Sequence, residues 1–206
     1  MALLCIAQNI HSQSLSATGQ QYTRGKIYID SRLPNLSLGK LIRYKETTAK
    51  LDDIYNKIII LDFWFTGCTA CIAQFPKEDS LQKEFANDIQ IIPVTYQSQK
   101  TVTTFLDKWE HDHGKMSLPL IVEDTLYESL FANNFSPHYT WISQDKRVIA
   151  HTSEDFITKE NIRAVLRQAL PIKQSILEDS TILKSGRMDE KGLYNYYQIK
   201  NTAHEE

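Results

Sequence analysis

The stretch IIILDFWFTGCTACIAQFP, residues 58–76, decides the fold of this 206-residue chain. From Lys57 to Phe65 the residues are β-branched or aromatic almost throughout, which is typical of a central strand buried on both faces. The apolar residues that follow recur at helical spacing and predict a helix over 69–85, kinked at Pro76. The sequence thus places Cys68 and Cys71 where a buried strand ends and a helix begins.

Strands and helices are expected to alternate on both sides of this stretch. Strands are identified by apolar/polar alternation and helices by apolar residues at i, i+3, i+4 spacing. The expected elements are, in chain order, short strands or a hairpin in 26–38 and 41–44, a helical turn at 51–55, a strand at 89–96, a helix ending near Gly114, a strand at 118–122, a short helix at 126–131, strands at 139–143 and 147–151, and a helix from an N-cap at Thr158 to residue 170. Pro93 suggests a bulge or an edge position for the strand at 89–96. This order predicts an α/β sheet with a mixed edge.

The composition excludes several classes of protein. With 42% hydrophobic and 23% charged residues, and only seven Gly and six Pro, the chain is neither collagen-like nor disordered and can bury a full core. The 23 Lys and Arg are scattered and are balanced by 25 Asp and Glu, which argues against nucleic-acid binding. No apolar run approaches the roughly 20 residues that cross a bilayer, so no transmembrane segment is expected.

The two ends of the chain differ from its central part. Residues 1–7 are apolar and a polar stretch follows, which resembles the end of a signal peptide without its positively charged leader. Residues 1–25 are therefore interpreted as a signal-peptide remnant and flexible leader, residues 26–170 as one domain, and residues 171–206 as a C-terminal extension of unknown role. That extension either packs on the domain or leads to a missing second domain. Cys5 fits a discarded signal residue better than a lipidated one, because the bulky Leu4 precedes it.

The pair Cys68 and Cys71 has two chemical interpretations. A Cys-x-x-Cys pair is half of a zinc site, but zinc needs four ligands. The candidates for the other half are Cys5, at the extreme end, and His111 and His113, whose spacing does not match that of zinc ligands. No metal site is therefore expected.

The position of the pair favours redox chemistry. At the start of a helix, unpaired N–H groups and the helix dipole favour a thiolate on Cys68. Cys71 lies one turn further along, less exposed, and close enough to attack a mixed disulfide formed on Cys68. We therefore expect a redox-active disulfide between Cys68 and Cys71 and no other cofactor.

The segment from Leu61 to Cys71, with Pro76 five residues further on, resembles the active-site segment of the thioredoxin superfamily. Ser136-Pro137, followed by a predicted strand, resembles the cis-proline loop of that superfamily. The extra helix, strand and helix between these motifs, and the short strands before residue 58, are similar to the cell-envelope thiol-disulfide reductases of the TlpA/ResA type. The resemblance implies a three-layer sandwich, in which helices flank a central mixed sheet with an N-terminal hairpin and a central α/β insertion.

The resemblance also implies roles for individual residues. Cys68 would be the attacking thiol and Cys71 the resolving thiol, and Asp62 would relay the proton of Cys71. The alternative for Asp62 is a strand carboxylate bonded to nearby backbone. Pro137 would be cis, and the backbone of Ser136 would pair with an extended substrate.

The rim of the site departs from the family pattern in three places. Gly67 stands where thioredoxins usually have Trp, which predicts a barer rim and a more mobile loop. Thr69 and Ala70 replace the common dipeptides and leave the reduction potential open. His138 could tune the cysteines, but a strand histidine that faces elsewhere is the favoured interpretation. Trp64 and Pro76 complete the expected rim.

Three functions compete at this stage. The leading one is a thiol-disulfide oxidoreductase of the cell envelope or periplasm, which reduces protein disulfides and is itself reduced by an upstream electron donor. A peroxiredoxin-like peroxidase shares the fold but needs Pro and Thr/Ser upstream of its cysteine, and here Thr66 lies only two residues before Cys68. A redox-inactive binding domain is expected to have lost a cysteine, and both are present.

Overall fold

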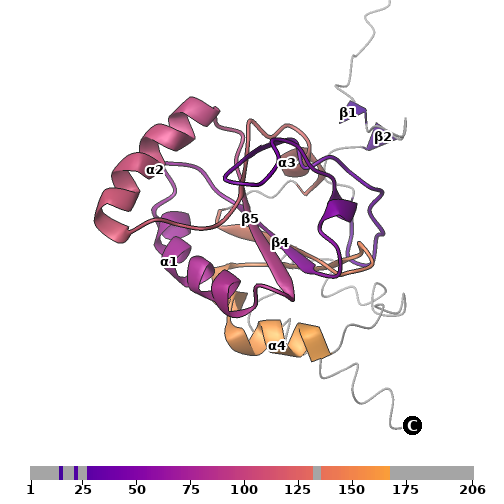
Figure 1. The fold of residues 1–206 in the computed structure, drawn as a ribbon. Coiled ribbons are helices and arrows are strands. Elements are labelled where there is room, and N and C mark those ends of the chain that lie inside the picture. The colour runs from indigo at the N-terminus through magenta and orange to yellow at the C-terminus, as the bar shows by residue number, and fades with distance from the viewer. Residues whose placement is uncertain (1–13, 16–20, 23–26, 132–135, 168–206) are drawn as a thin grey trace, which may run out of the picture.

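The predicted central strand is β4 (Ile58–Phe63), whose six side chains are all buried. The fold is seen in a computed structural model, which describes residues 14–15, 21–22, 27–131 and 136–167 (Figure 1). β4 pairs in parallel with β5 (Ile89–Val94) and antiparallel with β7 (His138–Ile142). The complete sheet is mixed and has the order β3-β6-β5-β4-β7-β8. Its edge strands are β3 (Lys40–Ile42) and β8 (Val148–Thr152), and β6 (Leu120–Val122) lies between β3 and β5.

The sheet separates two hydrophobic cores, because alternate side chains of a strand point to opposite faces. In β4, Ile58 and Ile60 belong to one core, and Ile59, Leu61 and Phe63 to the other. The first core is closed by side chains of α1 (Thr69–Glu84), α2 (Gln99–His113) and α4 (Lys159–Arg167). The second is closed by α3 (Tyr127–Leu130), the 3₁₀ helix η1 (Leu51–Asp53) and the loop that precedes it. This arrangement confirms the predicted α/β layers.

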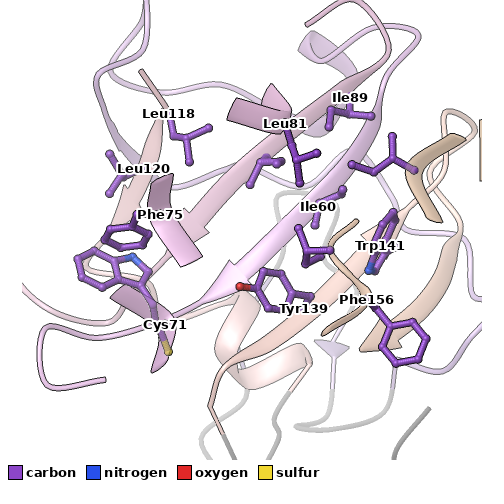
Figure 2. Close-up of a cluster of buried hydrophobic side chains, with 14 of the residues drawn as sticks. Ile60, Cys71, Phe75, Leu81, Ile89, Leu118, Leu120, Tyr139, Trp141 and Phe156 are labelled. Carbon is purple, nitrogen blue, oxygen red and sulfur yellow. The ribbon is translucent and has the colours of Figure 1, made fainter. Parts of the chain in front are cut away.

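Helix α1 begins at the edge of the first core and contributes several of the buried apolar side chains of that core. Figure 2 shows Cys71 and Phe75 on one side of this core and Trp141 and Phe156 on the other, with Ile60 and Tyr139 between them. All six side chains are at most 2% exposed. The second cysteine is therefore part of the packed interior.

Two helix ends form where the sequence predicts them, at Gly114 after α2 and at Thr158 before α4, and the structure adds a cap at Ser98. Ser98 caps α2, since its hydroxyl accepts a hydrogen bond from the Thr101 amide at 3.2 Å. The helix ends at Gly114, whose φ of 84° lies in the left-handed region that favours glycine. Thr158 caps α4 through the Asn161 amide at 3.2 Å. Capping is local, which is why the sequence alone predicts it.

The region before β4 differs from the prediction. The segments 26–38 and 41–44 form no hairpin with each other in the described residues, because β3 pairs instead with β6 at the edge of the main sheet. Residues 30–33 run beside β8, where the Asp30 amide bonds Val148 O at 2.7 Å. Leu33, Leu36 and Leu38 are all buried, so the segment is fixed by packing rather than by a strand ladder. A separate two-residue pairing joins β1 (Ser14–Leu15) to β2 (Gln21–Tyr22).

The two prolines of interest are accommodated inside regular elements. The edge position or bulge predicted from Pro93 is wrong, since β5 is an internal strand in unbroken register with β4. Val94 O accepts from the Trp64 amide on the β4 side, so by alternation Pro93 faces β6, where pairing starts only at Val94. The missing N–H therefore removes no ladder bond. Pro76 lies within the continuous helix α1.

The segments after Pro171 lie outside the described residues, as does most of the leader. Among the helices that the structure describes, none is both long enough and apolar enough to cross a membrane.

Candidate active site at the Cys68–Cys71 disulfide

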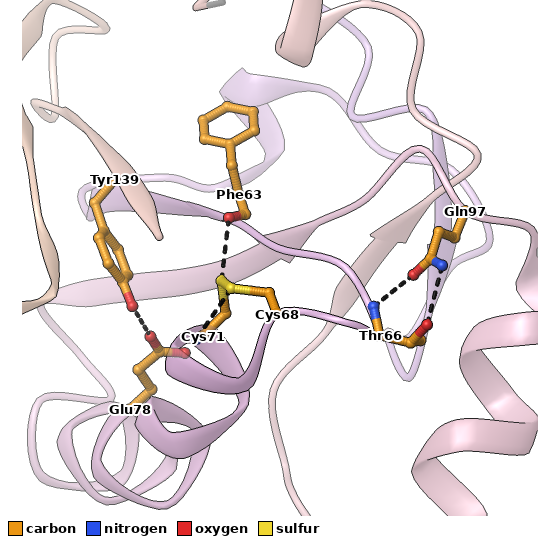
Figure 3. The surroundings of a disulfide bond; sticks show 7 residues. All are labelled: Phe63, Thr66, Cys68, Cys71, Glu78, Gln97 and Tyr139. Atoms are coloured by element: carbon orange, nitrogen blue, oxygen red, sulfur yellow. Dashed lines mark hydrogen bonds between the residues drawn. A yellow bond between two sulfur atoms is a disulfide. The ribbon is translucent and has the colours of Figure 1, made fainter. Parts of the chain in front are cut away.

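Cys68 and Cys71 form a disulfide at the start of α1, with their Cα atoms 5.3 Å apart (Figure 3). Cys68 is the N-cap of the helix, and its sulfur accepts a hydrogen bond from the Cys71 amide at 3.2 Å. Cys68 is 7% exposed and Cys71 is fully buried. After reduction, the same amide and the helix N-terminus favour a thiolate on Cys68, whereas burial opposes one on Cys71.

The loop before Cys68 is held by a side chain from the loop between β5 and α2. Gln97 Oε1 accepts from the Thr66 amide at 2.7 Å, and Gln97 Nε2 donates to Thr66 Oγ1 at 3.0 Å (Figure 3). The Cys68 amide donates to Phe65 O at 2.9 Å. Gly67, expected to make this loop mobile, thus lies in a clamped turn, and a Cβ there would approach the Phe65 ring to 3.0 Å. Sequence reasoning missed Gln97, which lies 29 residues after Cys68.

Asp62 lies on the face of β4 that carries the first core, and the carbonyl oxygen of the next residue, Phe63, is 3.9 Å from Cys71 Sγ. It is fully buried, and neither carboxyl oxygen has a hydrogen-bond partner among the described residues. The alternative of a carboxylate bonded to nearby backbone is therefore not supported. Burial raises the pKa of Asp62 well above its usual range, and the nearby Glu78 raises it further.

Glu78 is a second buried carboxyl group that sequence reasoning missed. It lies seven residues after Cys71 on α1, the spacing that returns to the same helix face after two turns. Tyr139 of β7 donates its hydroxyl to Glu78 Oε1 at 2.6 Å (Figure 3). Burial raises the pKa of Glu78 to about 7, against the lowering effects of Tyr139 and Lys77. The i+7 spacing from Cys71 was the signal available in the sequence.

The predicted proline loop lies immediately before β7. The Ser136–Pro137 peptide bond is cis, as predicted. Ser136 is exposed and Pro137 is buried, so the loop presents Ser136 to solvent. A shallow cavity is lined by Ser136 together with Trp64, Phe65 and Tyr96. This cavity places the proline loop beside the segment that leads to Cys68.

The expected rim residues have different environments. Gly67, Thr69 and Ala70 are exposed around the disulfide, and Pro76 is exposed further along α1. Trp64 is not at the rim: it is 2% exposed and packs edge-on against Phe75, with ring centroids 4.9 Å apart. The apolar sequence of β4 continues through this residue into the first core, which is why the indole is buried.

His138 faces away from the cysteines, as the favoured interpretation predicted. It stacks on Phe63 at 5.4 Å and on His151 at 5.5 Å, in the second core. Burial, with a contribution from His151, lowers the pKa of His138 to about 3. Tyr139 is its neighbour on β7 and points to the opposite face, where Asp62 is its register partner.

The part of the chain described by the structure contains no group of three or more His, Cys, Asp or Glu side chains that could hold a metal ion. At the site itself, the structure brings together a disulfide, two buried carboxyl groups and a tyrosine hydroxyl.

Comparison with known proteins assigns the domain. Residues 29–166 match the Redoxin family. The thioredoxin-like protein YneN of Bacillus subtilis is 26% identical over 153 residues, which cover 71% of this chain and 85% of that protein.

Two solved structures share the fold. One, from Chlorobium tepidum, is described as a thiol:disulfide interchange protein DsbE; it has 18% identity and a TM-score of 0.57, and the match covers 68% of this chain and 99% of that one. The other is the thioredoxin domain of a thiol-disulfide oxidoreductase from Bacteroides vulgatus, with 18% identity, a TM-score of 0.52, and coverage of 70% and 100%. The fold is thioredoxin-like, and the chain belongs to the Redoxin family.

Proposed function

We propose that the protein is a thiol-disulfide oxidoreductase that reduces disulfides of other proteins with the Cys68–Cys71 dithiol. The observation that carries this proposal is the asymmetry of the pair. Cys68 caps the helix and keeps 7% of its surface exposed, whereas Cys71 is fully buried behind it. Only Cys68 can meet an incoming disulfide, and only Cys71 is placed to release the product.

The reaction follows from this geometry in two steps. The Cys68 thiolate attacks a substrate disulfide, forming a mixed disulfide and releasing one substrate thiolate, which takes a proton from solvent. Cys71 then gives its proton to the buried carboxyl site at Asp62, and its thiolate attacks the Cys68 sulfur. The Cys68–Cys71 bond forms and the second substrate thiolate leaves. An upstream thiol donor then returns two electrons and two protons.

The substrate is proposed to bind as an extended peptide at the proline loop. Exposed Ser136 and the cavity that it shares with Tyr96 and Phe65 lie beside the segment leading to Cys68. A backbone that pairs with Ser136 in the manner of an added strand would bring a substrate disulfide to this rim.

We place this activity in the cell envelope, on the basis of the apolar residues 1–7 and the polar stretch after them. The C-terminal extension, residues 171–206, remains assigned either to packing on the domain or to a further domain. Fractionation of cells that express the protein from its native gene tests the location: recovery only with cytosolic proteins would contradict it.

The trapping of intermediates tests the function. Cys71→Ser should accumulate mixed disulfides with client proteins, because the adduct on Cys68 has lost its resolving thiol. Cys68→Ser is the matched control and should accumulate few. Non-reducing gels should show discrete adducts that dithiothreitol removes. Adducts on the Cys68→Ser protein instead would reverse the roles, while efficient peroxide consumption without protein adducts would support a peroxidase.

A further inference from the structure

Two carboxyl groups, rather than one, lie buried behind the disulfide. Asp62 enters from β4 and Glu78 from α1, and both are fully buried. They are close enough for the charge of Glu78 to raise the pKa of Asp62. Two neighbouring carboxyl groups in a low-dielectric interior do not both ionise readily, because their negative charges repel each other. Near neutral pH the pair therefore retains one proton.

The hydroxyl of Tyr139 links the two acids. It donates its one hydrogen to Glu78 at 2.6 Å, and Asp62 is its register partner on the neighbouring strand. The hydroxyl also lowers the pKa of Asp62, but it cannot donate to both acids at once. With its hydrogen on Glu78, it leaves Asp62 without a donor, which favours the proton on Asp62.

The other charged groups around the pair lie toward solvent. Lys77 of α1 lowers the pKa of Glu78, and Glu154 of the 3₁₀ helix η2 (Glu154–Phe156) raises that of Asp62. Lys77 donates to Glu154 O at 3.4 Å, so these two groups belong to one exposed edge. The remaining titratable neighbour is Cys71, on the same face of α1 as Glu78.

We infer that Asp62 and Glu78 act as one proton-holding pair bridged by Tyr139, in which Glu78 is a positioning residue that keeps the proton on Asp62 for Cys71. This inference rests on the proposed function and adds a residue to it. When a donor thiolate attacks Cys68, the disulfide breaks and its electron pair leaves on Cys71. Cys71 takes the proton of Asp62, and the ionised Asp62 takes it back when Cys71 next attacks a mixed disulfide on Cys68. The ionised Glu78 makes Asp62 a weaker acid that holds its proton to higher pH.

Glu78→Gln tests this role by a change in pH dependence. The variant keeps an oxygen that accepts from Tyr139 but removes the charge that raises the pKa of Asp62, so Asp62 should lose its proton at lower pH. Opening of the disulfide by dithiothreitol, followed by stopped flow, should then slow roughly tenfold relative to wild type at about pH 8 and little at about pH 6. Glu84→Gln, on the exposed end of the same helix, is the matched control.

A second variant tests the hydroxyl that links the pair. Tyr139→Phe removes the donor that keeps Glu78 ionised, so Glu78 should take the proton of the pair and the titration of Asp62 should move to lower pH. Carboxyl ¹³C chemical shifts of the full chain, recorded against pH, report Asp62 directly in all three variants. Shifts of the Asp62 titration to lower pH in Glu78→Gln and Tyr139→Phe, and none in Glu84→Gln, support the pair.

The outcome that overturns the inference is equally direct. If Glu78→Gln leaves the Asp62 titration in place and changes the opening rate by the same factor at every pH, Glu78 is a structural residue only. Dithiothreitol needs no protein substrate, so this result is independent of the trapping experiment. Adducts that fail to form would reject the protein reductase while leaving the proton pair testable.

Discussion

Gln97 positions the backbone next to the reactive cysteine although it does not touch either sulfur. Its amide makes two hydrogen bonds to Thr66, one to the backbone N–H and one to the hydroxyl. A net contribution of about 1 kcal/mol from each bond is enough to bias the loop toward a single geometry. The clamp therefore offsets the conformational freedom that Gly67 would otherwise give the rim.

Gln97→Ala should slow reduction of insulin about five- to thirtyfold, because about 1 to 2 kcal/mol of loop positioning is lost. Cys68, Cys71 and the core contacts remain, so the melting temperature should change little. Insulin turbidity and amide exchange at residues 66–68 measure the two effects. Gln144→Ala, a distant exposed glutamine at the β7–β8 turn, is the control. Unchanged exchange and unchanged rate would show that the clamp has no effect on the site.

At the scale of elements, the strand β7 contributes side chains to both hydrophobic cores. His138 and Thr140 face the second core, while Tyr139 and Trp141 face the first. Thr140 Oγ1 contacts His151 Nδ1 on β8 at 3.0 Å. Burial lowers the pKa of His151 to about 4, as it lowers that of His138 to about 3. This strand pair therefore holds two neutral histidines, of which His138 is buried and His151 is half-buried.

These histidines should make the protein sensitive to acid. The unfolded chain binds a proton on each near pH 6.5, so stability is present above that pH and is lost as the pH falls toward the folded values. Each group contributes a slope of up to about 1.4 kcal/mol per pH unit. His138→Phe should reduce this slope in urea unfolding between about pH 6 and pH 4. His111→Phe, at an exposed site, should not. Equal slopes in His138→Phe and wild type would contradict the assignment.

The whole molecule combines opposite pH responses on the two faces of its sheet. The neutral histidines of the second core stabilise the folded state least in acid. The carboxyl pair of the first core stabilises it most in acid, where the pair is protonated. For Asp62, whose pKa is raised on folding, stability is full below the unfolded pKa of about 4 and is lost as the pH rises through the folded value. The two effects oppose each other between about pH 4 and pH 6.5.

Asp62→Asn should therefore separate stability from activity. Its unfolding free energy relative to wild type should increase as the pH rises from about 5 to 8, because the variant has no charge to bury. Turnover of insulin near neutral pH should fall, because Cys71 has lost its proton partner. Asp107→Asn, at an exposed site on α2, should alter neither. A stability difference that is constant with pH, together with normal turnover, would remove Asp62 from both roles.

The sequence by itself determined those features that local chemistry controls. The β-branched run predicted β4, the Cys-x-x-Cys spacing predicted the disulfide, and the resemblance to the thioredoxin superfamily predicted the cis bond before Pro137. Caps at Thr158 and Gly114 followed from single residues and their neighbours. In each case the deciding contacts lie within a few residues along the chain, or the residue type itself limits the backbone.

Only the tertiary structure decided which distant residues meet at the site. Glu78 became part of it because strand register places Tyr139 opposite Asp62 and because the α1 face that carries Cys71 packs on that strand. Gln97 contacts Thr66 because β5 lies beside β4 in the sheet. The strand β3 pairs with β6 instead of forming the predicted hairpin. A pattern of apolar residues shows which side chains are buried, but it does not specify their neighbours. That choice depends on strand order and register, which the whole core sets together.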